Sequence, residues 1–167
     1  MVGAAGECRA NGVKLTVLAI GTRMPAWVTA GVDEYSKRLP PELKLDIREL
    51  NLPNRTKYSP QQAVAQEAKL IRDCLKPRDQ LVVLDVQGKS FSTEKLAARL
   101  QDWQMSGDNV TLVIGGPDGV EDSLLAEAGL CWSLSPLTLP HPLVRVVLAE
   151  QLYRAWTINA GHPYHRS

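Results

Sequence analysis

The stretch 134-LSPLTLPHPLVRVVLAEQLYR-154 joins a proline-rich segment to a long apolar helix. Its three prolines remove backbone donors and restrain the residues before them, which predicts a stiff, non-helical loop over Ser135–His141. Pro142 is well placed to begin the helix, which we predict from about Leu143 to Ala160. A rigid loop before a buried helix can hold a ligand against backbone groups. Packing of the last core helix is the simpler interpretation, and this stretch alone favours it.

Composition describes an ordinary globular chain of 167 residues, 44% hydrophobic and 22% charged, which is most simply one domain. It has no apolar run long enough to cross a bilayer and no signal-peptide core at its start. The three cysteines, Cys8, Cys74 and Cys131, share no CxxC spacing and indicate neither a disulfide framework nor a zinc site. We therefore expect a reducing, cytoplasmic setting and no metal.

Charge is divided unevenly, although the formal net charge is only +1. Residues 1–80 hold 13 Lys and Arg against 9 Asp and Glu, and residues 81–167 hold 6 against 9, so the halves carry +4 and −3. The basic half could form a docking face, with Arg23, Arg55 and Lys57 as weak candidates. A mixed, solvated surface is the more frequent explanation.

Apolar periodicity predicts alternating strands and helices after a small, unpatterned segment over residues 1–13, which we expect to be a disordered extension. Residues 14–167 then form one domain. We predict strands over Lys14–Ile20, Leu43–Leu50, Leu81–Val86, Val110–Ile114 and Trp132–Leu134. We predict helices over Pro25–Leu39, Gln61–Leu75, Thr93–Met105, Glu121–Ala128 and Leu143–Ala160. This order predicts a single-domain α/β fold with a largely parallel sheet.

Three connections in this pattern could bind a ligand, because ligands of open parallel sheets sit beyond the carboxyl ends of the strands. They are the segment from Leu84 to Lys89, the loop Gly115–Gly119, and the proline loop Ser135–Pro140. Adjacent glycines let backbone groups approach a ligand closely, but a tight turn explains GGPDG equally well. The motif matches neither GxGxxG nor GxxxxGKS/T, so it indicates no dinucleotide or triphosphate site.

The last helix carries two unusual sets of polar residues. Glu150, Gln151, Arg154 and Thr157 fall on one side, and Glu150 can pair with Arg154 at i,i+4 spacing. Arg145 projects from nearly the opposite, apolar side. Its charge needs a carboxylate across a subunit interface or an anionic ligand, unless the side chain reaches a nearby edge.

The tail 161-GHPYHRS-167 concentrates side chains that can do chemistry, although termini are usually disordered. His162 and His165 are of a type that titrates near neutrality, and Arg166 can bind a phosphate through two hydrogen bonds. The chain has no HExxH motif or Cys/His cluster and no GxSxG elbow, so neither a metal site nor a serine hydrolase is indicated.

Four separated stretches resemble one family: KLTVLAIGTRMPAWV, VLDVQGK, LVIGGPDG, and LSPLTLPHPLVRVVLAEQLYRAW with the tail HPYHR. The family is RlmH, the 23S ribosomal RNA (pseudouridine-N3)-methyltransferases of the SPOUT class. The resemblance covers Lys14 to the C-terminus, and Val13-Lys14-Leu15 stands where family chains usually begin. It implies a C-terminal trefoil knot and a homodimer packed through it, with Arg145 at the dimer seam.

The resemblance also implies a cofactor, a substrate and site residues. S-adenosyl-L-methionine would lie against Leu84, Gly115, Gly116, Leu134, Ser135, Pro136, Leu137, Thr138 and Leu139. A pseudouridine of 23S ribosomal RNA in the assembled ribosome would be methylated at N3. The implied catalytic candidates are Arg154, Tyr164, His165 and Arg166. A non-catalytic ribosome-binding factor that keeps the fold, and a small-molecule α/β enzyme, are the alternative functions.

Overall fold

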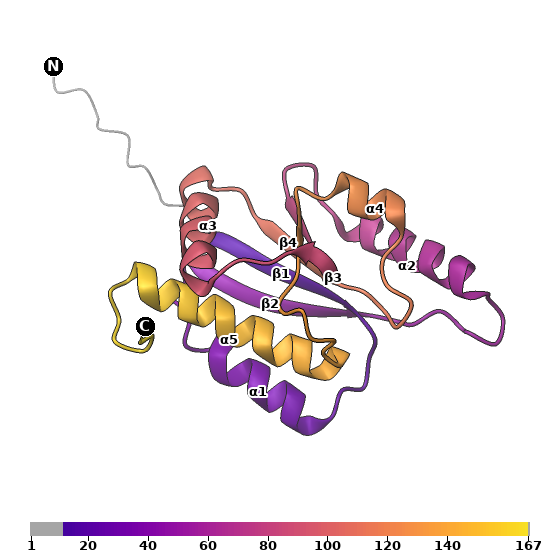
Figure 1. The fold of residues 1–167 in the computed structure, drawn as a ribbon, viewed down its shortest axis with the longest axis horizontal. Helices are drawn as coiled ribbons and strands as arrows, with labels where there is room; N and C mark the ends of the chain where they lie inside the picture. Colours follow the sequence, from indigo (N-terminus) through magenta and orange to yellow (C-terminus); the bar gives the residue numbers. More distant parts are fainter. Residues whose placement is uncertain (1–11, 167) are drawn as a thin grey trace, which may run out of the picture.

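The computed structural model describes residues 12–166, which form one α/β domain (Figure 1). Five strands and five helices follow one another in the described chain. The strands are β1 (Val13–Ile20), β2 (Leu43–Leu50), β3 (Gln80–Lys89), β4 (Val110–Ile114) and β5 (Leu130–Trp132). The helices are α1 (Ala26–Ser36), α2 (Pro60–Cys74), α3 (Thr93–Ser106), α4 (Asp122–Glu127) and α5 (His141–Asn159).

The strands form one sheet in the order β2-β1-β4-β3-β5, with every pair parallel. The predicted fold class is therefore confirmed. Since all five strands run in the same direction, their carboxyl ends meet at one edge of the sheet. The threading of the chain that a trefoil knot requires stays a prediction.

Helix boundaries follow from local capping chemistry. The Ser59 hydroxyl accepts a hydrogen bond from the Gln62 amide, and the Gln62 side chain accepts one from the Ser59 amide, which is a capping box. The Ser92 hydroxyl caps α3 by accepting one hydrogen bond from the Lys95 amide. Helix α3 ends at Gly107, whose φ of 73° lies in the left-handed region that favours glycine.

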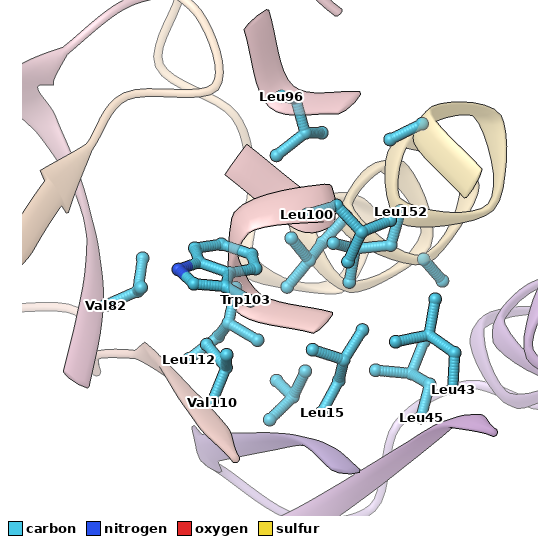
Figure 2. Close-up of a cluster of buried hydrophobic side chains, with 14 of the residues drawn as sticks. Leu15, Leu43, Leu45, Val82, Leu96, Leu100, Trp103, Val110, Leu112 and Leu152 are labelled. Atoms are coloured by element: carbon cyan, nitrogen blue, oxygen red, sulfur yellow. The ribbon is translucent and has the colours of Figure 1, made fainter. Parts of the chain in front are cut away.

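Helices cover both faces of the sheet and bury two apolar cores. Helices α1, α3 and α5 pack on one face, and α2 and α4 on the other (Figure 1). Strand β1 alternates between the two cores, with Leu15 and Val17 in the first and Leu18 and Ile20 in the second. Figure 2 shows the first core, where Leu112 of β4 lies among side chains from α3 and α5.

Several boundaries differ from the sequence prediction. Strand β1 begins at the buried residue Val13, whereas the sequence prediction places this residue in the N-terminal extension. Residues 1–11 of that predicted extension lie outside the described part of the chain. Strand β5 covers Leu130–Trp132 instead of Trp132–Leu134. Strand β3 continues to Lys89, with a register shift against β5 between Leu84 and Lys89, so four residues bulge out of the sheet.

One apolar residue of the predicted helix pattern faces outward. Trp27 is 54% exposed, whereas its neighbour Val28 is buried together with Val32. Successive residues of a helix point about 100° apart, so Val28 and Val32 share the inner face and Trp27 does not.

Leu112→Ala tests the first core. The side chain is fully buried in the middle of β4, so its truncation should lower the free energy of unfolding by about 2–5 kcal/mol. Met105→Ala is the control, because Met105 is 80% exposed and its truncation should change stability by less than about 0.5 kcal/mol. Urea unfolding measures both, and equal losses would contradict this description of the core.

Candidate active site

A pocket of about 540 Å³ opens at the carboxyl edge of the sheet and is lined by residues that follow β1, β2, β4 and β5 and by residues of the bulge in β3. We call it the carboxyl-edge pocket. Its walls come from the ends of β1 and β2, the bulge of β3, the glycine loop (Gly115–Gly119) after β4, the proline loop after β5, and the start of α5. They contain Met24, Leu52, Leu84, Asp85, Val86, Ile114, Gly115, Gly116, Pro117, Gly119, Val120, Trp132, Leu134, Ser135, Leu137, Thr138, Leu139, His141 and Val144.

The three connections singled out from the sequence therefore converge on one cavity. Every residue implied as a cofactor contact lines the pocket except Pro136. Of the predicted segment from Leu84 to Lys89, the first three residues line the pocket, whereas Gln87, Gly88 and Lys89 do not. The bulge of β3 explains this difference, because it carries Asp85 and Val86 away from the sheet ladder and toward the pocket.

Close packing behind the glycine loop requires both of its first two residues to be glycine. A Cβ on Gly115 would lie 2.6 Å from a methyl group of Val120, and a Cβ on Gly116 would lie 2.7 Å from Oε1 of Glu67. The loop therefore presents bare backbone to the pocket on one side while it packs tightly on the other.

Arg145 ties the start of α5 to the ends of two strands. Its side chain is 3% exposed and donates hydrogen bonds to the Gly21 carbonyl at 2.8 Å and to Nε2 of His141 at 2.9 Å. It also pairs with Glu49 of β2 at 3.3 Å. A carboxylate of the same chain therefore supplies a partner for this charge, and the place of Arg145 at a subunit seam stays a prediction.

His141 connects this charge to the pocket wall. Partial burial lowers the pKa of His141 below its ordinary value, and the positive charge of Arg145 lowers it further. A hydrogen bond with the Gly115 backbone and the charge of Glu49 oppose the shift. The ring is therefore neutral near pH 7, which leaves Nε2 free to accept the hydrogen bond from Arg145.

A second polar group, which we call the tail cluster, joins the C-terminal tail to α5 and α3. The Arg154 Nε donates to the Glu150 carboxylate at 2.9 Å, and the Tyr164 hydroxyl donates to the same oxygen at 3.1 Å. His165 lies 3.2 Å from Arg154 through Nδ1 and 3.2 Å from Glu94 through Nε2. Burial and Glu150 raise the pKa of Tyr164 to about 12, so its phenol is protonated near neutral pH.

The tail cluster does not reach the carboxyl-edge pocket of its own chain. The pocket contains Val144 in the first turn of α5, whereas Arg154 lies ten residues further on, a rise of about 15 Å. The candidates Arg154, Tyr164 and His165 are close together, and Arg166 is exposed beside them. None of the four lines the pocket.

The structure also distinguishes the basic candidates. Arg55 is engaged by Asp118 and Glu67, while Arg23 and Lys57 are exposed. Arg23 has a φ of 61° in the β1–α1 connection, which is uncommon for a residue with a side chain. Residues 12–166 contain no group of His, Cys, Asp and Glu suited to a metal ion, and no helix among them is long and apolar enough to span a membrane.

A family model described as predicted SPOUT methyltransferase matches residues 13–165. The chain belongs to the SPOUT methyltransferase family. Proteins named Ribosomal RNA large subunit methyltransferase H from Saccharophagus degradans, Hahella chejuensis and Chromohalobacter salexigens are 54%, 50% and 51% identical to it. Each alignment spans 155 residues, which is 92% of this chain and 100%, 99% and 100% of the relatives.

Sequence reasoning missed several residues of the carboxyl-edge pocket. Met24, Leu52 and His141 line it, and Glu67 supports the glycine loop from behind. Two signals were present in the sequence. Met24 and Leu52 closely follow predicted strands, where ligands bind in parallel sheets, and Glu67 interrupts the inner face of α2 between Ala63 and Ile71.

His141→Phe tests the hydrogen bond between Arg145 and His141 at the wall of the carboxyl-edge pocket. It removes the acceptor for Arg145, so at pH 8 it should lower the free energy of unfolding by about 1–2 kcal/mol. The folded state depresses the pKa of His141, so the contribution of the neutral ring is present above about pH 6.5 and is lost as the pH falls below it.

The stability difference between wild type and His141→Phe should therefore narrow from pH 6.5 downward. Urea unfolding between pH 8 and pH 5.5 measures it. Leu112→Ala is the control, and its destabilisation should stay constant over the same range. A His141→Phe difference that is also constant would contradict the inferred neutral ring.

Proposed function

We propose that the chain uses S-adenosyl-L-methionine to methylate N3 of a pseudouridine in 23S ribosomal RNA, acting on the assembled ribosome in the cytoplasm. The carboxyl-edge pocket is the observation that carries the proposal. It lies where parallel sheets bind ligands, and its three unusual walls are those singled out from the sequence. The SPOUT family match and the names of the relatives support the reaction class and the RNA substrate.

The pocket residues fit a methyl donor of this kind. A cavity of about 540 Å³ lies within the range usual for small-molecule sites. Leucine side chains of the proline loop offer an apolar wall for an adenine ring, and the backbone of Gly115 and Gly116 offers polar groups at close range. The carboxylate of Asp85 suits a hydroxyl or ammonium group. The donor supplies a methyl group activated by a positively charged sulfur.

The proposed active site needs two copies of the chain. The tail cluster lies about 15 Å along α5 from the pocket of its own chain, so a partner subunit must bring its tail to that pocket. Exposed apolar residues support a homodimer through this side of the molecule. Trp27 of α1 is 54% exposed and Leu143 of α5 is 36% exposed, and the two helices lie side by side (Figure 1).

The tail residues can position the nucleobase and its negative charge. For methyl transfer, the ring N3 must lose a proton and then attack the methyl carbon in line with the bond to sulfur. Arg154 and Arg166 carry fixed positive charges that can bind a phosphate or stabilise the N3 anion. The raised pKa of Tyr164 keeps its phenol protonated near neutral pH, so it serves as a hydrogen-bond donor and not as the base. His165 is the remaining candidate to accept the proton.

Methylation of ribosomes that lack this modification tests the proposed function directly. Purified protein and S-adenosyl-L-methionine are incubated with such ribosomes, and the nucleosides are analysed by mass spectrometry. The expected product is N3-methylpseudouridine in the large-subunit RNA. If the protein binds ribosomes but forms no methylated nucleoside, the alternative of a non-catalytic ribosome-binding factor replaces the proposal.

Arg166→Ala tests whether the tail serves methyl transfer while the pocket serves donor binding. Since Arg166 lies outside the pocket, the variant should lose methyl transfer by about 100-fold or more while it binds S-adenosylhomocysteine like the wild type. Calorimetry measures binding, and single-turnover assays on ribosomes measure transfer. Arg78→Ala, at an exposed arginine before β3, is the matched control and should change neither. Equal loss of binding and transfer in Arg166→Ala would contradict this division of roles.

A further inference from the structure

The back of the glycine loop rests on a buried carboxyl group. Glu67 lies on the inner face of α2, and its side chain is 4% exposed. A Cβ on Gly116 would lie 2.7 Å from Oε1 and 3.2 Å from Cδ of Glu67, so the loop backbone is in direct contact with this side chain. The loop therefore separates Glu67 from the pocket, with one face toward each.

The buried carboxyl group of Glu67 is stabilised by the guanidinium of Arg55. Oε1 of Glu67 has no hydrogen-bond partner within residues 12–166, and the guanidinium of Arg55 lies 3.5 Å from it. Burial raises the pKa of Glu67, whereas Arg55 and the nearby Gly116 backbone favour the charged form. Since an isolated buried carboxylate is costly, Arg55 and Glu67 hold each other in place.

Arg55 also holds the glycine loop itself. It forms an ion pair with Asp118, which lies in the turn closed by the hydrogen bond from the Gly119 amide to the Gly116 carbonyl at 3.1 Å. Glu67 thus supports the start of the turn, and Arg55 supports its tip. The three charged residues come from α2, the β2–α2 connection and the loop, and none of them lines the pocket.

We infer that Arg55 and Glu67 are positioning residues for the methyl donor, acting through the backbone of the glycine loop. This inference rests on the proposed function of the pocket. By clamping the loop between α2 and the β2–α2 connection, the two side chains fix the backbone groups of Gly115 and Gly116 that the donor would contact. Loss of the clamp lets these groups move, so donor affinity falls although no donor contact is removed.

The probe is S-adenosylhomocysteine, titrated into the purified full-length chain by calorimetry. Arg55→Ala and Glu67→Ala should each weaken binding by about tenfold, because each removes one partner of a buried ion pair behind the loop. The double variant should be about as weak as the weaker single variant, because the two residues act as a unit. Asp118→Asn removes the charge that pairs with Arg55 at a partly exposed loop residue, so it should also weaken binding and leave the core undisturbed.

Arg72→Ala is the matched control. The Arg72 side chain is 34% exposed against 35% for Arg55, and it also forms two ion pairs, but these go to Glu121 and Glu127 around α4. It should lose similar stability in urea unfolding and bind S-adenosylhomocysteine within about twofold of the wild type. This comparison separates positioning of the loop from general stabilisation of the fold.

Three results would each overturn the inference. The first is wild-type affinity in Arg55→Ala and Asp118→Asn. The second is a loss in Arg72→Ala equal to that in Arg55→Ala. The third is an Arg55→Ala variant with unchanged binding and a raised KM for ribosomes, which would make Arg55 an RNA contact. Failure of the proposed function is distinguishable, because the wild type itself would then bind no S-adenosylhomocysteine.

Discussion

The fold depends on the burial of one positive charge, the guanidinium of Arg145 at the start of α5. A buried cation needs partners on every side, and Arg145 finds them in the Gly21 carbonyl, Glu49 and His141. These partners come from the end of β1, the strand β2 and the first turn of α5. Removal of any of them leaves a charge or an acceptor unpaired in the interior. The three segments are therefore fixed together at the carboxyl edge of the sheet.

The pocket follows from this constraint together with the parallel order of the strands. Because every strand ends at the same edge, the connections after β1, β2, β4 and β5 contribute to its walls together with the bulge of β3. His141 is both a partner of Arg145 and a wall residue, so the buried charge is linked to the pocket through a single ring. Glu67 and Arg55 hold the opposite wall, where the glycine loop has no room for side chains at Gly115 and Gly116.

Much of the fold could be predicted from local patterns, because each buried strand appears as an apolar run and each helix as a periodic one. Strand β4 matches its predicted bounds, and the alternation in β2 correctly indicates a half-exposed strand. Predictions are wrong where distant pairing decides the outcome. The continuation of β3 to Lys89 depends on its pairing with Trp132, and the partner of Arg145 lies 96 residues earlier in the chain. Neither relation leaves a trace in the neighbouring residues.

Some parts of the candidate site could likewise be predicted from local patterns, and others could not. Glycines and prolines, which are unusual by themselves, indicated the walls of the pocket, and all but Pro136 of the implied contacts line it. Two polar residues were not indicated in this way: Glu67, behind the glycine loop, looks like an ordinary helix residue, and His141, which lines the pocket, looks like the end of a stiff loop. In the proposed homodimer, the position of the tail relative to the pocket depends on a second chain, which no pattern within one chain can specify.

The central claim is that the carboxyl-edge pocket binds the methyl donor. Amide chemical shifts of the isotopically labelled protein, followed by NMR as S-adenosylhomocysteine is added, test it most directly. We expect the largest changes at Gly115, Gly116 and residues 134–139, with small changes in α2 outside Glu67 and in β2. Saturable binding with changes confined to the tail cluster, or no binding at millimolar concentration, would contradict the claim.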